Sequence, residues 1–167
     1  FDRLARLHLP SIAALNGHAF GGGLELACAC DLRVMAPKAT LALPEARVGI
    51  VPGWSGTQRM LRLLPEPVVK EMTLFGRRIT ADRAAGFGFV AEIAGDVLTA
   101  AQDIATDLDQ LSPRAIEVAK SMICAGQGED RAAMIEALGS AAIAASEDRA
   151  EGVSAFLNKQ KPDFPGR

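Results

Sequence analysis

The first third of the chain alternates short apolar runs with glycine turns. Apolar runs at residues 11–15, 32–36 and 40–43 have the length of buried strands. Residues 24–30 lie between the first two runs and predict a buried helix, because Glu25 is their one charged position. The order of strand, glycine turn, helix and strand predicts an α/β fold with a mainly parallel sheet.

Beyond residue 56 the spacing of apolar positions predicts a mostly helical remainder, interrupted by a strand-like run at 87–93. Thr57 is expected to cap the first of these helices, which Pro65 stops. An alanine-rich face at 132–145 fits either a tightly packed core or a contact with another subunit. The predicted helices span residues 2–9, 58–64, 66–75, 80–86, 96–111, 113–125, 129–146 and 147–157.

The composition is that of one globular domain. The chain has 167 residues, 49% of them hydrophobic, which is enough for a sizeable core. The net charge is −2 and no run of lysine and arginine forms a basic stripe, so no nucleic-acid partner is expected. No uninterrupted apolar stretch reaches the roughly 18 residues of a transmembrane helix, so no membrane partner is expected either.

The three cysteines are expected to be buried free thiols in a reducing compartment. Their odd number argues against a disulfide framework. Cys28 and Cys30 are two residues apart on a predicted helix, so we expect their side chains to point to different faces.

Three consecutive glycines, Gly21, Gly22 and Gly23, precede the predicted helix at 24–30. Glycine tolerates positive φ and lets a ligand approach the backbone closely. Backbone N–H groups at the start of a helix suit a developing oxyanion, because they are fixed before the charge appears. A tight packing turn remains an alternative. A dinucleotide-binding turn requires G-x-G-x-x-G, which this spacing does not fit.

Glu25 and Glu45 are carboxylates in apolar surroundings, each beside a glycine turn. Such groups serve general acid–base catalysis when they face a reacting atom. Plainer alternatives stay open for both. Glu25 could face solvent on the open side of its helix, and Glu45 could cap a turn after Pro44 or pair with Arg47 at the surface.

The remaining candidates point away from metal and hydrolase chemistry. His8 and His18 lack metal-ligand spacing with another histidine or cysteine, so no metal site is expected, and His18 is expected to be structural. Ser55 has no G-x-S-x-G context, which argues against a hydrolase nucleophile. Trp54, the single tryptophan, lies in a glycine loop and is expected to pack against something, such as an apolar ligand.

Four stretches resemble the enoyl-CoA hydratase/isomerase family, the crotonase superfamily, and the resemblance covers nearly the whole chain. Two of them carry the glycines and the acids, and two lie towards the C-terminus. They read NGHAFGGGLELACACDLRV, ALPEARVGIVPGWSGTQRM, GRRITADRAAGFGFVAEI and SEDRAEGVSAFLNKQKPDF.

The resemblance implies a crotonase-like spiral core of ββα units with a C-terminal helical region that drives formation of a homo-trimer or hexamer. Residues 1–93 would be the later part of the core with the active-site motifs, and residues 94–167 the helical trimerisation and acyl-CoA-covering region. The chain begins with Phe1, so we expect the first part of the core, and any targeting peptide, to lie upstream.

The resemblance also assigns roles to single residues. Gly22 matches one of two backbone oxyanion donors, and the other donor is expected upstream of Phe1. Glu25 and Glu45 match the two glutamates that hold the reacting water in the hydratase branch. The expected substrate-binding residues are Gly21, Gly53, Trp54 and Lys161, the last reaching the phosphates of coenzyme A.

Retention of both glutamates implies hydration of a trans-2-enoyl-CoA thioester through an enolate-like state, within fatty acid β-oxidation. The partner would be an acyl-CoA substrate, with no metal or cofactor besides the coenzyme A of the substrate itself. Alternatives are double-bond isomerisation, hydration of a branched, methylglutaconyl-type substrate, and a non-catalytic oligomerising acyl-CoA-binding module. The expected location is the cytoplasm, or the mitochondrial matrix in a eukaryote.

Overall fold

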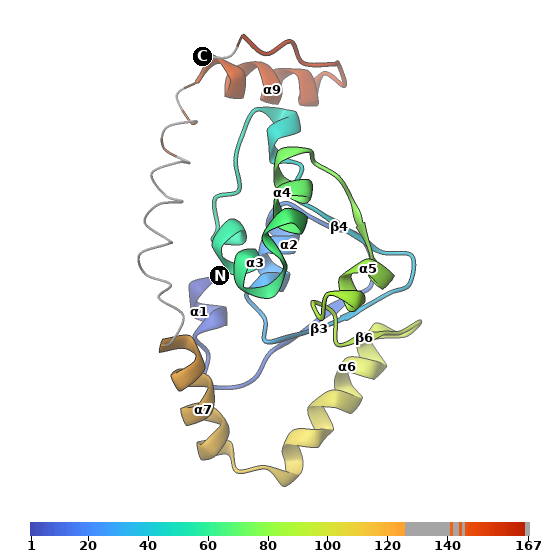
Figure 1. Ribbon diagram of the computed structural model, residues 1–167, viewed down its shortest axis with the longest axis vertical. Helices are drawn as coiled ribbons and strands as arrows, with labels where there is room; N and C mark the ends of the chain where they lie inside the picture. The colour runs from blue at the N-terminus through green and yellow to red at the C-terminus, as the bar shows by residue number, and fades with distance from the viewer. Residues whose placement is uncertain (126–140, 142–143, 145, 166–167) are drawn as a thin grey trace.

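The computed structural model describes residues 1–125, 141, 144 and 146–165. Figure 1 shows helices arranged around a small β core, with α9 at one end of the molecule and α6 and α7 at the other. The predicted helix at 129–146 and the alanine-rich face at 132–145 lie outside the described residues. Among the described residues, no helix is both long enough and apolar enough to cross a membrane.

Two three-stranded sheets form the β core, and most of their strand pairs are parallel, as the apolar pattern predicts. In the first sheet β3 lies between β1 and β6, and both pairs are parallel. In the second, β4 lies parallel to β2 and antiparallel to β5. The strands are β1 Ile12–Leu15, β2 Ala19–Phe20, β3 Leu32–Met35, β4 Thr40–Ala42, β5 Ile79–Thr80 and β6 Glu92–Ile93.

The helices follow the predicted order with different ends. Residues 2–9 hold a helix of four residues, and the helix predicted at 96–111 changes to a 3₁₀ turn after Thr106. The helices are α1 Asp2–Ala5, α2 Gly22–Cys28, α3 Gly56–Leu63, α4 Glu66–Leu74, α5 Ala81–Gly86, α6 Val97–Thr106, α7 Pro113–Ala125 and α9 Glu147–Leu157, with 3₁₀ turns η1 Glu45–Val48 and η2 Asp107–Gln110.

The cap predicted at Thr57 is wrong. The residue before α3 is Ser55, at a left-handed φ of 70°, and its side chain makes no capping bond. The N–H of Gly56, the first residue of α3, instead donates to the carboxylate of Glu25 in α2. The start of α3 is therefore set by a side chain from another helix, which no local pattern reveals.

Buried apolar side chains from α2, α3, α4, α5 and the strands form one main core. Its fully buried members include Leu24, Leu41, Met60, Met72 and Phe89. At about 25 cal/mol per Å² of apolar surface, each such side chain contributes about 1.5–3 kcal/mol to folding. The core holds α2 in place, and α2 carries the first of the two candidate acids.

Arg33 is a buried cation that closes the C-terminal end of α2. It donates to the carbonyls of Ala27, Cys30, Asp31 and Phe89 over 2.6–3.2 Å. Its guanidinium also lies over the Phe89 ring, 4.7 Å from the centroid. Burial lowers the pKa of the guanidinium. These bonds supply donors to carbonyls at and just after the end of α2, and they fix α2 against β3.

Helix α9 docks on η1 through two glycines that allow backbone to touch backbone. A Cβ atom added at Gly152 in α9 would collide with the backbone of Val48 and Gly49. A Cβ atom at Gly49, which has a φ of 69°, would collide with the backbone of Asp148 in α9. The turn that begins with Glu45 is therefore supported by the last helix of the chain.

We expect Gly152→Ala to detach α9 from η1, because the new methyl group meets backbone atoms that cannot move aside. The free energy of local opening at residues 147–157, measured by hydrogen exchange, should fall by about 1–3 kcal/mol. The control is Gly86→Ala, since a Cβ atom there meets nothing within 4 Å. Unchanged protection of α9 in Gly152→Ala would contradict this packing.

Candidate active site

The carboxylate of Glu25 lies buried between α2 and α3, with 2% of the residue exposed. Its Oε1 atom accepts hydrogen bonds from the backbone N–H groups of Trp54 and Gly56, both at 2.9 Å. A Cβ atom on Gly56 would lie 2.6 Å from Cγ of Glu25, so the close approach requires glycine. The alternative in which Glu25 faces solvent is therefore wrong.

Glu45 is the first residue of η1 and is 8% exposed. Its Oε1 atom would lie 2.9 Å from a Cβ atom at Gly21, so the carboxylate reaches the glycine turn. Gly21 has a φ of 53° and donates its N–H to the carbonyl of Ala42 at 3.0 Å. Because Glu45 is buried, the alternative in which it pairs with Arg47 at the surface is wrong. Its contact with Gly21 places this acid beside the residue that precedes α2.

Trp54 covers the same glycine turn with its ring, at Gly22. Its ring would lie 2.8 Å from a Cβ atom at Gly22, the first residue of α2. The ring also contacts Phe1 edge to face, with 5.2 Å between centroids. Trp54 is nevertheless 62% exposed. An aromatic ring with one face on glycine backbone and much of its surface open suits contact with an apolar ligand.

These contacts bring together Gly21, Gly22, Glu25, Glu45 and Trp54, which we call the glycine–glutamate site. Gly53 directly precedes Trp54 and is exposed. Lys161 is exposed in the segment after α9, and no described contact joins it to the site. The structure thus unites five of the seven predicted residues, and the roles of all seven remain predictions.

Two arginines that were not predicted from the sequence position the site. Arg59 is 3% exposed, donates to the carbonyl of Trp54 at 3.2 Å and binds Asp2 at 2.6 Å. This ion pair holds the pKa of Asp2 below its usual range. Arg47 donates to the carbonyls of Phe75 and Gly76 and so ties η1 to the end of α4. In the sequence both look like ordinary surface charges, and only the tertiary fold reveals their partners.

His18 has the structural role expected of it. Its Nδ1 atom accepts the N–H of Thr40 at 3.1 Å, and its ring stacks on Phe20 with 5.4 Å between centroids. These contacts join the turn before β2 to the start of β4.

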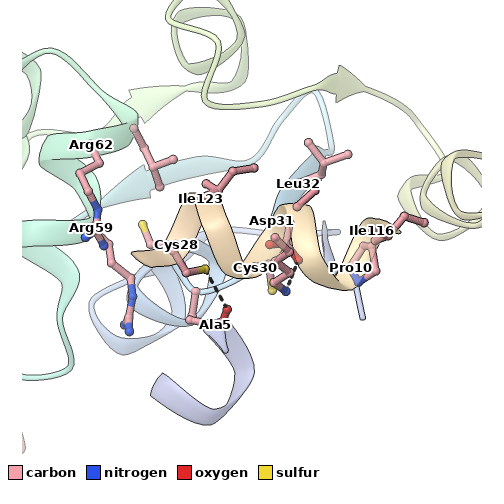
Figure 2. A pocket seen from close by; sticks show the side chains of 15 residues that line it. Ala5, Pro10, Cys28, Cys30, Asp31, Leu32, Arg59, Arg62, Ile116 and Ile123 are labelled. Carbon is pink, nitrogen blue, oxygen red and sulfur yellow. Dashed lines mark hydrogen bonds and ion pairs between the residues drawn. The ribbon is translucent and has the colours of Figure 1, made fainter. Parts of the chain in front are cut away.

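A hollow of about 520 Å³ lies between α2, α3 and α7 and is lined by all three cysteines (Figure 2). Cys28 and Cys30 both line it, and Cys30 lies beyond the end of α2 at Cys28, so, contrary to expectation, the two are not on one helix. Cys28 is buried, whereas Cys30 and Cys124 are partly exposed. Lys120 and Asp31 both line the hollow and form an ion pair at 2.7 Å. The hollow contains neither candidate glutamate.

We expect Cys28 to resist alkylation in the folded protein, because burial raises the pKa of its thiol to about 12. The thiolate is the reactive form, and its fraction at pH 8 is about 10⁻⁴ for such a pKa. Reactivity should rise only as the pH approaches 12. Peptide mass spectrometry after iodoacetamide should find Cys28 unlabelled in native protein and labelled in guanidinium chloride. Rapid native labelling at pH 8 would contradict its burial.

Comparison with known proteins places these features in a family. The sequence matches the family model described as enoyl-CoA hydratase/isomerase over residues 1–167. It is 40% identical to 2,3-dehydroadipyl-CoA hydratase of Escherichia coli, over 99% of this chain and 66% of that protein. It is 39% identical to a probable mitochondrial enoyl-CoA hydratase 2 of Arabidopsis thaliana, over 99% of this chain and 56% of that protein.

Comparison with solved structures leads to the same family. Carnitinyl-CoA hydratase from Mycobacterium avium superposes with a TM-score of 0.92 at 32% identity, over 96% of this chain and 64% of that one. Methylmalonyl-CoA decarboxylase superposes with a TM-score of 0.87 at 25% identity, over 99% and 67% of the two chains. The chain spans between 56% and 66% of the length of the two curated relatives above. It belongs to the enoyl-CoA hydratase/isomerase family and has the crotonase fold.

Proposed function

We propose that the protein is a hydratase that adds water across the 2,3 double bond of a trans-2-enoyl-CoA thioester. The observation that carries the proposal is that two buried glutamates flank one glycine turn: Glu25 lies in the first turn of α2, and Oε1 of Glu45 reaches Gly21, the residue before α2. Relatives named as hydratases, and a dehydratase for carnitinyl-CoA, support acyl-CoA chemistry of this type.

In the proposed reaction Glu25 and Glu45 hold one water molecule between them. Glu25 accepts a proton from the water as its oxygen bonds to Cβ of the enoyl group. The double-bond electrons move to the thioester oxygen, which becomes an enolate-like oxyanion. Glu45 then gives a proton to Cα, and the carbonyl reforms. Before the next turnover the proton on Glu25 passes through solvent to Glu45, so each glutamate both takes up and gives off a proton, and these steps use no metal.

The backbone supplies the electrostatic part of this mechanism. The N–H of Gly22 lies in the first turn of α2, where it has no acceptor within the helix, and we propose that it binds the thioester oxygen. The two N–H groups on Oε1 hold Glu25 in one orientation, so its proton transfer needs little reorganisation. We propose further that Gly21, Gly53 and Trp54 line the acyl group and that Lys161 reaches a phosphate of coenzyme A.

The residues of the glycine–glutamate site could also serve isomerisation or hydration of a branched substrate, so the test includes analysis of the product. Isomerisation moves the double bond without adding water, whereas hydration raises the product mass by one water molecule. Branched substrates of the methylglutaconyl type need a separate assay. A protein that binds acyl-CoA and oligomerises without turnover would leave the enoyl-thioester absorbance unchanged.

Assembly and location are further proposals. We propose a trimer or hexamer, testable by light scattering, with no cofactor beyond the coenzyme A of the substrate. We place the reaction in fatty acid β-oxidation, in the cytoplasm or the mitochondrial matrix.

Replacing either acid should remove most hydratase activity. For Glu25→Gln and for Glu45→Gln we expect kcat to fall by about 10²–10⁴-fold, because glutamine keeps the shape but cannot exchange the proton. The measurement follows loss of the conjugated enoyl-thioester absorbance with the purified protein.

Glu92→Gln is the matched control, since Glu92 is an exposed glutamate in β6. Its activity should stay within about twofold of the parent. Circular dichroism and thermal unfolding establish that each variant is folded. Hydration that survives in folded Glu25→Gln and Glu45→Gln proteins would overturn the mechanism.

A further inference from the structure

Another hollow, of about 410 Å³, is lined by three arginines and, among the described residues, by no acid. We call it the arginine hollow, and we infer that it binds a phosphate group of a small anionic ligand. Its walls come from β2, β4, η1 and the segment between α4 and β5. Its lining residues are Phe20, Ala42, Pro44, Arg47, Gly76, Arg77 and Arg78.

The sheet geometry explains why a hollow exists at this place. Ala19 pairs with Leu41 and Phe20 with Ala42 in the parallel ladder of β2 and β4. Side chains alternate between the two faces of a sheet. Ala19 and Leu41 belong to the buried core, so Phe20 and Ala42 lie on the opposite face and form the floor.

Two of the three guanidinium groups are held in place without using a carboxylate. Arg78 lies over the Phe20 ring at 4.8 Å from its centroid, and His18 stacks on the same ring. Arg47 donates from Nη2 to the carbonyls of Phe75 and Gly76, at 3.4 and 3.3 Å. A guanidinium has five N–H donors, so these bonds orient Arg47 and still leave donors for a ligand. Backbone carbonyls and an aromatic ring carry no negative charge, so Arg47 and Arg78 both keep their positive charge for a ligand.

Arg77 is the least restrained of the three. Its nearest acid is Glu71, at 3.9 Å, and Glu71 is already bound in a bidentate pair by Arg83 at 2.8 and 3.1 Å. That pair holds the pKa of Glu71 below its usual range. The contact with Arg77 is thus a weak second interaction, and 71% of the Arg77 side chain stays exposed, so its guanidinium can contact a ligand.

The chemistry of the lining selects the class of ligand. Three cations around one hollow repel one another, and an anion that contacts all three removes this repulsion. Planar guanidinium forks match the oxygens of phosphate in pairs. A single carboxylate would engage one fork, whereas a phosphate or diphosphate has enough oxygens and charge for three. The hollow therefore suits a phosphate-bearing molecule.

The hollow also adjoins the glycine–glutamate site along the chain. Phe20 directly precedes Gly21, and Pro44 directly precedes Glu45. The phosphate could therefore belong to a free ligand or to the coenzyme A part of a bound substrate. Binding of the coenzyme A part rests on the proposed function, whereas binding of a free ligand does not.

The test is isothermal titration of the purified protein with inorganic diphosphate at constant ionic strength. We expect one saturable site, and at least about tenfold weaker binding in both Arg77→Gln and Arg78→Gln. Arg114→Gln is the control, because Arg114 is an exposed arginine on α7, paired with Glu117 and remote from the lining. Its affinity should stay within about twofold of the parent. Thermal unfolding establishes that the variants are folded.

No saturable binding by the parent protein would overturn the inference. Equal loss of affinity in Arg114→Gln would also overturn it, because the attraction would then be general. A competition experiment between diphosphate and acyl-CoA identifies the source of the phosphate. If diphosphate weakens acyl-CoA binding, the substrate's own phosphates occupy the hollow, and if both bind together, a separate ligand does. Both results support the site, and neither titration depends on turnover.

Discussion

The rest of the site depends on the hydrogen bonds that the carboxylate of Glu25 accepts. It accepts the N–H of Gly56 and so acts as the cap that α3 lacks in its own sequence. It also accepts the N–H of Trp54, which fixes the loop that lays the indole ring on Gly22. A negative charge is favoured at this position by the dipole of α3. One acid from the core therefore orients a second helix and a loop.

Glu45 is held by a different part of the molecule. Its turn is anchored by Arg47 to the end of α4 and is supported from outside by α9 through Gly49 and Gly152. Glu25 is thus held within the core, whereas the turn that begins with Glu45 is also supported by the C-terminal helix. The docking of α9 therefore helps to position Glu45 relative to the core. The same anchoring of Arg47 shapes the arginine hollow, which links both sites to one turn.

Much of this arrangement could be predicted from local patterns. The strands β1, β3 and β4 are apolar runs with clear ends, and the glycines with Glu25 and Glu45 form a pattern specific enough to indicate a family. The strands β2 and β5 have two residues each, too short for any periodicity, and form only because β4 lies beside them. The partners of Arg33 and Arg59 are backbone carbonyls and a distant acid, which sequence spacing does not reveal. The cap of α3 was mispredicted for the same reason.

In the proposed reaction the reacting carbons of an enoyl-CoA lie between Glu25 and Glu45, with the thioester oxygen on Gly22. A crystal structure with a non-hydrolysable enoyl-CoA analogue would show where these atoms lie. We expect the thioester oxygen at about 2.7–3.1 Å from the Gly22 nitrogen. We also expect a carboxylate oxygen of each glutamate within about 3.5 Å of the water or carbon with which it exchanges a proton. An acyl group bound elsewhere, such as in the cysteine-lined hollow beside α7, would contradict the proposed reaction.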